Sequence, residues 1–458
     1  MKLTVIGAGP GGYEAAIYAA KKGFEVVLID KDELGGTCLN RGCIPTKALI
    51  ASYDAYEAVA DADDFGILKD GTVTIDYEKI IERKNKVVKN LVKGIGMLIK
   101  ANKITYVNGF GSLVDKNTVK VVKEGGEEEL ISTDYVILAT GSVPTVPKMF
   151  GYDGKRVISS NEILDMNTLP KSIIIVGGGV IGCEIGQFLA KMGSDVTVVE
   201  MQDRILSTCD EDVIKHVLRQ FKKDKVKVIT SDGVSEVIVG EDSVEVTLNS
   251  GKSLSAEYLM VSVGRRPYTE GLNLDNAGVE LTERGFIKTD ETLRTTADNI
   301  YAIGDILSSY QLAHVASKEA FVAVDNILGK NKQMKYNAVP ACVFTNPQVA
   351  TVGKTEFELK DEGVNYKVGT FDFKTLGKAQ ASGHLTGFVK VMTDENDVII
   401  GAAIVGHEAS DMLQVLTTAV TLGLTAEEVG DCIFPHPTMC EAIMEALHDL
   451  HGVSIHKV

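Results

Sequence analysis

One pattern occurs twice in this chain and restricts its fold more than any other feature. A short apolar segment runs into a glycine-rich loop, GAGPGG at 7–12 and GGGVIG at 177–182, and a helical pattern follows each loop. A second apolar segment then ends at an acid, Asp30 in the first copy and Glu200 in the second. The glycines and the acid recur at an offset of 170 residues. Strand, glycine loop, helix, strand and acid in this order predict two dinucleotide-binding βαβ units.

Each residue type in such a loop has its own task. The first glycine makes the tight turn, the second lets the backbone approach a pyrophosphate, and the third lets helix and strand pack closely. The acid accepts hydrogen bonds from ribose hydroxyls, and a carboxylate at Glu200 would repel a 2′-phosphate. We therefore expect NAD(H), not NADP(H), in the second unit; alternatively, one loop only packs a helix on a sheet. The candidate loop residues are Gly7, Gly9 and Gly12 in the first copy and Gly177, Gly178, Gly179, Val180, Ile181 and Gly182 in the second.

Three further apolar segments complete the nucleotide-binding pattern. Residues 136–142 and 259–267 each end in a turn of small residues, and residues 299–305 end in Gly304-Asp305. An aspartate at the end of a strand can reach a cofactor hydroxyl, although it could equally cap a turn. These segments predict that two nucleotide domains are interleaved along the chain.

The chain changes character from residue 336. Residues 389–392 and 398–406 read as antiparallel strands joined by a polar turn, and amphipathic helices are expected near 408–422 and 439–450. This pattern predicts an α+β domain without a phosphate loop. Such a domain is a candidate for contacts between subunits.

Cys38 and Cys43 form a closely spaced pair directly after the first βαβ copy. Seven cysteines are an odd number in a long chain, which argues against a framework of structural disulfides and favours redox use of this pair. Pro45 suits the first turn of a helix, so we expect the two cysteines to flank a loop that leads into a helix near that residue. A thiolate at the helix N-terminus would have a lowered pKa. The alternative is two packed core thiols.

The overall charge excludes some classes of partner. A net charge of -16 argues against sequence-independent binding to nucleic acid or to anionic membranes. No apolar run approaches the ~18–20 residues that cross a bilayer, and no charged leader precedes the strand expected at residues 2–6. We expect a cytoplasmic protein.

Together with the segment HPTMCE at 436–441, these motifs resemble those of the pyridine nucleotide–disulfide oxidoreductases, and within that family the members that oxidise dihydrolipoamide. The resemblance extends from residue 1 to about residue 450. It implies an α/β fold with two Rossmann-like dinucleotide-binding domains and a C-terminal α+β dimerisation domain. The implied segments are FAD-binding 1–145 and 268–335, NAD-binding 146–267, and interface 336–458.

The resemblance also assigns catalytic roles. Cys43 would face the flavin of one tightly bound FAD, and Cys38 would exchange with the substrate sulfur. His436 matches the family's base and Glu441 the carboxylate that orients it, both reaching the site from the partner subunit of a homodimer. His436 alone could instead be a surface residue before a proline turn. No metal is implied.

Further residues would contact the cofactors. The resemblance places Lys47 near the isoalloxazine, Gly111 at the adenine, Asp305 at the ribityl chain and Glu184 near the nicotinamide. The full set of additional candidates is Asp30, Lys31, Gly36, Thr37, Lys47, Gly111, Thr140, Gly141, Ser142, Asp305, Ala313 and His314 for FAD, and Glu184, Glu200, Val234 and Gly264 for NAD.

The implied reaction is oxidation of a protein-bound dihydrolipoyl group with NAD⁺. The partner would be a lipoylated carrier protein, either the acyltransferase core of a 2-oxoacid dehydrogenase complex or the carrier of the glycine cleavage system. The alternatives are a reductase of glutathione-type disulfides and a non-catalytic flavoprotein scaffold. Three residues depart from the family pattern, and they would affect redox tuning and not the reaction itself. They are Asp30 in place of glutamate, Phe434 in place of a second histidine, and Cys440 in place of serine.

Overall fold

The computed structural model describes residues 1–308 and 310–457, which form two compact units. Unit 1 comprises Met1–Lys148, Tyr152–Leu169 and Val263–Met334. Unit 2 comprises Met149–Gly151, Pro170–Ser262 and Lys335–Val458. Within the described residues, no helix combines the length and the apolar character that a membrane span requires. The first predicted βαβ unit lies in unit 1 and the second in unit 2. The four-segment division expected from the sequence stays a prediction.

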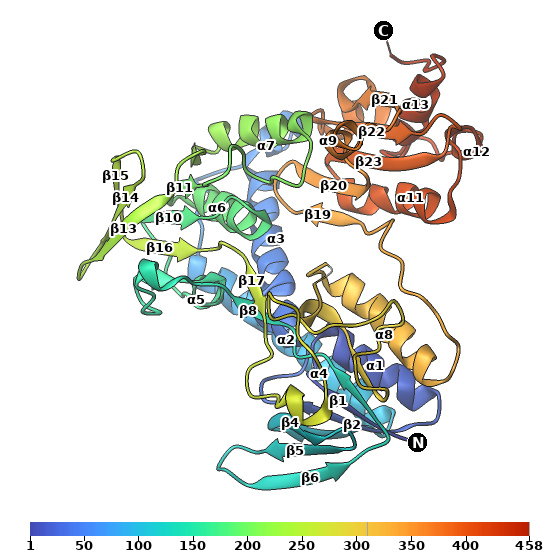
Figure 1. Ribbon diagram of the computed structural model, residues 1–458. Helices are drawn as coiled ribbons and strands as arrows, with labels where there is room; N and C mark the ends of the chain where they lie inside the picture. The colour runs from blue at the N-terminus through green and yellow to red at the C-terminus, as the bar shows by residue number, and fades with distance from the viewer. Residues whose placement is uncertain (309, 458) are drawn as a thin grey trace. The chain divides into compact units, whose positions relative to one another are not determined.

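The centre of unit 1 is a parallel sheet in the order β18-β7-β1-β2-β3. Apart from the edge strand β3, its strands are mostly apolar and buried, as expected for a parallel sheet that is covered on both faces. Helices α1 and α8 lie side by side (Figure 1). The rings of Tyr18 and Phe321 pack between them, with their centroids 4.6 Å apart. The sheet and these helices comprise β1 (Lys2–Ile6), α1 (Pro10–Lys21), β2 (Glu25–Asp30), β3 (Thr105–Asn108), β7 (Tyr135–Leu138), β18 (Ile300–Ala302) and α8 (Ala313–Ile327).

The remaining elements of unit 1 surround this sheet. Two helices carry the cysteine pair, the long helix α4 packs on them, and an antiparallel sheet β4-β5-β6 follows. Strands β8 and β17 form an antiparallel pair of their own. These elements are α2 (Gly36–Arg41), α3 (Cys43–Ala60), α4 (Tyr77–Ala101), β4 (Phe110–Asp115), β5 (Thr118–Val122), β6 (Glu128–Ser132), β8 (Ser142–Pro144), β9 (Val157–Ile158), α5 (Ser160–Asp165) and β17 (Arg265–Pro267).

The first part of unit 2 has the same plan as unit 1, a parallel sheet followed by a three-stranded antiparallel sheet. Strands β12, β11, β10 and β16 pair in parallel in that order, and an antiparallel sheet β13-β14-β15 follows. The elements are β10 (Ser172–Val176), α6 (Val180–Met192), β11 (Asp195–Val199), α7 (Glu211–Lys223), β12 (Lys227–Ile229), β13 (Val234–Val239), β14 (Val244–Leu248), β15 (Ser253–Ala256) and β16 (Tyr258–Val261).

The second part of unit 2 is an α+β structure around the antiparallel sheet β19-β20-β23-β22-β21. The strands and helices expected here from the sequence are confirmed, because β22 pairs antiparallel with β23 and two helices follow. One face of the sheet and helices α11 and α13 enclose an apolar core. The elements are β19 (Ala341–Val343), β20 (Gln348–Gly353), α9 (Glu356–Asp361), β21 (Lys367–Asp372), α10 (Gly377–Ser382), β22 (Gly387–Thr393), β23 (Ile399–Gly406), α11 (Ala409–Leu422), α12 (Ala426–Gly430) and α13 (Glu441–Leu450).

The repeat seen in the sequence is also a repeat of strand register. Lys2 pairs with Glu25 in the first copy, and Ser172 pairs with Asp195 in the second, so the same offset of 170 residues holds across both strands. The register continues without a bulge through each pair of strands. The predicted pair of βαβ units is therefore confirmed.

Glycines set the tight packing of each loop. Gly7 and Gly177 have φ of 107° and 106°, in the left-handed region that favours glycine. A Cβ on Gly12 would overlap the carbonyl oxygen of Gly7, and a Cβ on Gly182 would overlap that of Gly177. Since the colliding atom is backbone in both cases, no side chain can move aside to make room. The helix can approach its strand only because these positions lack a side chain.

We expect Gly182→Ala to destabilise unit 2 while the neighbouring Gly179→Ala does not. The added methyl group of the first variant meets backbone, and overpacking of this kind costs about 1–3 kcal/mol. Gly179 has φ of -75°, and a Cβ on it would have nothing within 4 Å, so the second variant keeps the fold. Chemical denaturation of both variants measures the difference. Equal stability of the two would contradict this account of the loop.

Candidate functional site

The cysteine-bearing helix α2 starts directly on the first glycine loop. The backbone N–H of Gly35 donates to the carbonyl oxygen of Ala8 at 2.8 Å. Gly36 lies so close to Gly9 that a Cβ on it would be 2.6 Å from the Gly9 Cα. The side chain of Asn40 closes this helix by donating to the Gly36 carbonyl oxygen at 3.0 Å. The loop and the start of the Cys38 helix are therefore one packed structure.

The residues between the two cysteines are helical up to Arg41, where a loop was expected. Cys38 is inside α2, and Cys43 is the first residue of α3, two residues before the expected start near Pro45. Gly42 separates the helices, because its φ of -147° and ψ of -114° are not helical. The Thr46 hydroxyl donates to the Gly42 carbonyl oxygen at 2.8 Å and so joins the first turn of α3 to this break.

The two thiols interact directly, and the structure shows them without a disulfide. A side-chain hydrogen bond with Cys43 and burial raise the pKa of Cys38, and the nearby charge of Lys47 opposes this shift. Cys43, not Cys38, begins α3, so the lowered pKa expected for a thiolate at that helix N-terminus stays a prediction. The raised pKa favours the protonated form of Cys38. Lys47 lies one turn further along α3, close enough to act on Cys38.

A partly buried chain of polar contacts joins the start of β17 to the turn after β18. Arg265 donates through Nε to the Ser142 hydroxyl and through Nη2 to the Ser142 carbonyl oxygen, both at 2.7 Å. The Ser142 hydroxyl in turn donates to Asp305 Oδ2 at 2.5 Å. Burial lowers the pKa of Arg265, while the charges of Asp305 and Cys43 oppose this shift. The guanidinium thus lies in the electrostatic environment of both Asp305 and Cys43.

Sequence reasoning missed Arg265 as a residue of this site. The available signal was its position directly after Gly264, at the end of the second predicted strand-and-turn segment. That signal is weak, because only pairing of β8 with β17 brings Arg265 next to Ser142, 123 residues away in sequence.

The other candidates of the first site gather around the same loop. Thr140 donates to the Tyr268 carbonyl oxygen at 2.6 Å, and Lys31 donates to the Tyr268 hydroxyl at 2.8 Å. A Cβ on Gly111 would meet Ile6 and Ile29 side chains at 3.1 and 3.2 Å, so Gly111 packs at the ends of β1 and β2. Thr37 lies in α2, and Ala313 and His314 form the first turn of α8.

The two acids that end the second strands make the same contact in both copies. Asp30 accepts from the backbone N–H of Ala8, and Glu200 accepts from that of Gly178 at 2.7 Å. Each carboxylate also accepts from the backbone N–H two residues further on, at 2.9 Å for Asp30 and 2.8 Å for Glu200. Burial raises the pKa of Asp30. The acids therefore hold their own loops and keep lone pairs for a ribose hydroxyl.

Both loops have room for the phosphates of a dinucleotide. The nearest atom to a Cβ built on Gly9 is the Gly36 Cα, at 4.0 Å, and positions Gly179 and Gly141 have nothing within 4 Å. Val180 and Ile181, which begin α6, are exposed and half-buried. Open backbone at the start of a helix, beside an acid, suits a bound pyrophosphate and ribose. The residues present at each loop therefore fit the pyrophosphate and ribose of a dinucleotide.

The remaining NAD candidates are divided between the units. Glu184 lies buried on α6, where its Oε1 accepts from the backbone N–H of Phe344 at 2.8 Å. Val234 begins β13 in unit 2, next to Gly233, whose Cβ position is 3.7 Å from Met201. Gly264 belongs to unit 1, with φ of 120° and nothing within 4 Å of its Cβ position.

His436 and Glu441 form a hydrogen-bonded pair in unit 2. His436 Nδ1 lies 2.8 Å from Glu441 Oε1, and Glu441 Oε2 accepts from the backbone N–H of Thr438 at 2.8 Å. The Glu441 side chain is 16% exposed and is fixed by both bonds, whereas the His436 side chain is 77% exposed. This geometry assigns Nδ1 to the carboxylate and leaves Nε2 as the nitrogen that can exchange a proton with a substrate.

Comparison with known proteins agrees with this arrangement. The family model described as pyridine nucleotide-disulphide oxidoreductase matches residues 1–320, and the dimerisation domain of the same family matches residues 339–447. Dihydrolipoyl dehydrogenase of Chlamydia muridarum is 41% identical over 97% of this chain and 95% of its own length. That of Geobacillus stearothermophilus is 41% identical over 99% of this chain and 97% of its own.

Solved structures give the same result. LpdA of Mycobacterium tuberculosis has a TM-score of 0.93 at 28% identity, covering 98% of this chain and 99% of its own. The flavoprotein disulfide reductase RclA of Escherichia coli has a TM-score of 0.88 at 27% identity, covering 97% and 98%. The expected α/β fold with an α+β dimerisation domain is confirmed, and this family depends on FAD and a pyridine nucleotide. The chain belongs to the pyridine nucleotide-disulphide oxidoreductase family.

Proposed function

We propose that this chain is an NAD⁺-dependent flavoprotein that oxidises protein-bound dihydrolipoamide to lipoamide. The observation that carries the proposal is the packing of the Cys38 helix directly on the first glycine loop. This packing puts a dithiol next to a dinucleotide site within one unit. The names of the relatives that match over nearly the full chain support the substrate.

The exchange of thiols and disulfides needs only the lipoyl group and the two cysteines of this chain. One thiolate of the dihydrolipoyl group attacks Cys38 Sγ of the oxidised Cys38–Cys43 disulfide, and Cys43 leaves as a thiolate. The second lipoyl thiol then attacks the mixed disulfide, which releases cyclic lipoamide and Cys38 as a thiol. Two electrons and two protons leave the lipoyl group in these steps. The hydrogen bond from Cys38 to Cys43 suits this outcome, because it keeps the remaining proton on Cys38.

The His436–Glu441 pair would manage the protons. Nε2 of His436 accepts a proton from the lipoyl thiol that attacks, and Glu441 holds the ring and stabilises its charged form. The exposure of His436 and the dimerisation domain support a homodimer in which this pair serves the cysteines of the partner subunit. Glu441 is the positioning residue of the pair, since it acts through His436.

The cofactors would occupy the two loops. The residues Gly7, Gly9, Gly12, Asp30, Ser142 and Asp305 would hold FAD, and Gly177, Gly179, Gly182 and Glu200 would hold NAD. When bound, FAD supplies a carrier that passes two electrons from the cysteine pair to the nicotinamide. Glu200 favours NAD over NADP, because its carboxylate would face the position of a 2′-phosphate. The partner is then a lipoylated carrier of a 2-oxoacid dehydrogenase complex or of glycine cleavage, in the cytoplasm.

We expect Cys43→Ser to retain FAD and lose lipoamide turnover. Serine fills the same space and keeps the start of α3, but its oxygen cannot form or reduce a disulfide. The flavin spectrum of the purified variant and a steady-state assay with dihydrolipoamide and NAD⁺ measure the two effects. Cys432→Ser is the matched control, because Cys432 is an exposed cysteine elsewhere in the chain and should keep normal turnover. Turnover by Cys43→Ser would exclude this mechanism.

We expect Glu441→Gln to lower kcat for dihydrolipoamide by about 10²-fold, since positioned acid–base groups contribute about 10²–10⁴-fold. The amide keeps the size of the side chain but removes the charge that stabilises protonated His436. The expected signature is a displaced pH–rate profile at unchanged NAD⁺ affinity. Glu408→Gln, on an exposed acid outside the pair, is the control. An unchanged pH–rate profile would argue against the pair as the proton relay.

We expect the wild-type enzyme to prefer NAD⁺ over NADP⁺, and Glu200→Ser to reduce that preference by about tenfold or more. Removing the carboxylate removes repulsion of a 2′-phosphate, and about 1.4 kcal/mol corresponds to tenfold in affinity. The ratio of kcat/KM for the two nucleotides measures the effect. A wild-type enzyme that accepts both equally would overturn the role given to Glu200.

A further inference from the structure

The nucleotide-binding part of unit 2 is tied to its α+β part through α6. Gln187 exchanges two hydrogen bonds with the backbone of Asn346, at 2.7 Å from Nε2 and 2.8 Å to Oε1. One turn earlier on the same helix, Glu184 accepts from Phe344. The helix that begins at the second glycine loop is therefore bonded at two points to the segment after β19.

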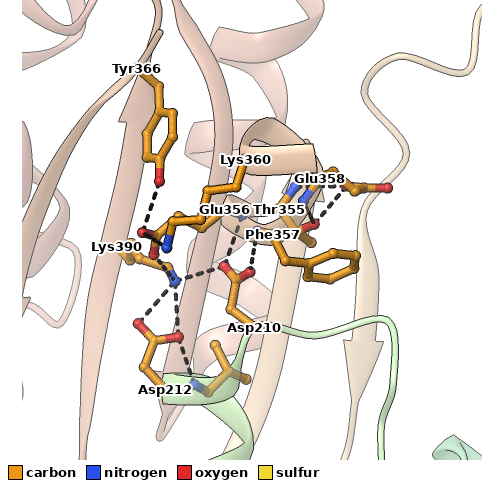
Figure 2. Close-up of polar contacts among 10 residues, drawn as sticks. Asp210, Asp212, Thr355, Glu356, Phe357, Glu358, Lys360, Tyr366 and Lys390 are labelled. Carbon is orange, nitrogen blue, oxygen red and sulfur yellow. Dashed lines mark hydrogen bonds and ion pairs between the residues drawn. The ribbon is translucent and has the colours of Figure 1, made fainter. Parts of the chain in front are cut away.

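A buried lysine makes a second connection, through α7. Lys390 lies on β22 with 1% of its side chain exposed. Its ammonium contacts Asp210 at 2.7 Å, both oxygens of Asp212 at 2.9 Å, and Glu356 at 3.3 Å (Figure 2). Burial lowers the pKa of Lys390, but the hydrogen bonds with Asp210 and Asp212 outweigh this and raise it. The lysine is thus charged, and it joins three carboxylates from two parts of the unit.

Asp210 has a further contact with the α+β part. It is the residue before α7, yet its carboxylate does not cap that helix. Its two oxygens accept from the backbone N–H groups of Glu356 and Phe357 at 3.2 Å, at the start of α9 (Figure 2). Because Asp210 is 5% exposed, water offers it little compensation for the loss of these partners. Lys390 and α9 together fix the position of Asp210.

The segment that ends at Asp210 contacts the second glycine loop. Residues 201–209 connect Glu200 with Asp210, and the backbone N–H of Leu206 donates to the carbonyl oxygen of Gly178 at 2.8 Å. A Cβ on Gly178 would lie 2.6 Å from the Ile205 side chain. This segment therefore covers one side of the loop, with Glu200 at one end and Asp210 at the other.

We propose that Lys390 is a positioning residue for dinucleotide binding, because it holds Asp210 and through it the segment 201–209 that packs on Gly178. The proposal rests on the assignment of the second loop as the NAD site. Lys390 itself touches no cofactor; it acts by fixing the end of a nine-residue connection. Without the ammonium, three carboxylates repel one another, and the end of this connection moves away from its place at the loop.

The direct test is the affinity of the purified flavoenzyme for NAD⁺ after Lys390→Met. Methionine fills the buried volume without a charge. We expect the dissociation constant for NAD⁺, measured by titration calorimetry, to rise about tenfold, as networks of this kind typically change coupling by about 3- to 30-fold. The rate of flavin reduction by dihydrolipoamide without NAD⁺ should stay within about twofold in the same protein, because Lys390 bonds Asp210, Asp212 and Glu356 and not the cysteines or the His436–Glu441 pair.

Two matched variants separate positioning from loss of structure. Lys360→Met removes an exposed lysine that bonds Glu356 at 2.8 Å, so it should leave NAD⁺ affinity unchanged. Asp212→Asn weakens the contact with Lys390 from a half-exposed position, and we expect a rise of about threefold. This milder variant keeps the proposal testable if Lys390→Met does not fold. Adding Asp212→Asn to Lys390→Met should recover part of the lost affinity, since it removes one repelling charge.

The outcomes distinguish this proposal from the assignment of the NAD site. Gly179→Ala should weaken NAD⁺ binding at unchanged stability, and failure to do so would contradict the NAD site itself. If Gly179→Ala weakens binding but folded Lys390→Met and Asp212→Asn do not, Lys390 has no positioning role. A loss of NAD⁺ affinity in Lys360→Met, or a parallel loss of flavin reduction in Lys390→Met, would also overturn the proposal.

Discussion

The close approach of helix and strand at two glycine loops is the constraint on which the rest of this structure depends. In each copy the first glycine lies against the residue after a neighbouring strand, Ala139 in unit 1 and Ser262 in unit 2. The third glycine of each loop lies against the carbonyl oxygen of the first. These contacts exclude a Cβ, so the backbone at the loop stays accessible. The backbone groups that would bind a phosphate are accessible because these glycines carry no Cβ.

The same constraint explains why a redox dithiol can lie beside the first loop. Gly36 begins α2 against Gly9, and only glycine permits that approach. Cys38 follows two residues later, so its position is set by the loop and not by a separate domain. The hydrogen bond with Cys43 then makes the two thiols chemically unequal, which a dithiol relay requires. Helix α2 therefore sets both the position of Cys38 beside the loop and the hydrogen bond that raises its pKa.

Much of the architecture was predictable because its determinants are local. The glycine spacing, the two acids and the strands β22 and β23 follow from periodicity and from the steric needs of tight turns. The helix α2 was not predicted, since a six-residue helix between two glycines has little signal of its own. The raised pKa of Cys38 was not predicted either, because burial and the hydrogen bond with Cys43 depend on how α2 packs against α3.

The sequence by itself determined the two nucleotide-binding units, the cysteine pair and the α+β end of the chain, because each is encoded by residues close together. Only the tertiary structure decided which distant groups hold them. Arg265 bonds Ser142 across 123 residues, and Lys390 bonds Asp212 across 178. Such partners leave no periodic pattern, because a buried charge is positioned by whichever strand and helix pack around it. The reactive groups can therefore be recognised in short segments of sequence, whereas the distant residues that position them are set by the fold.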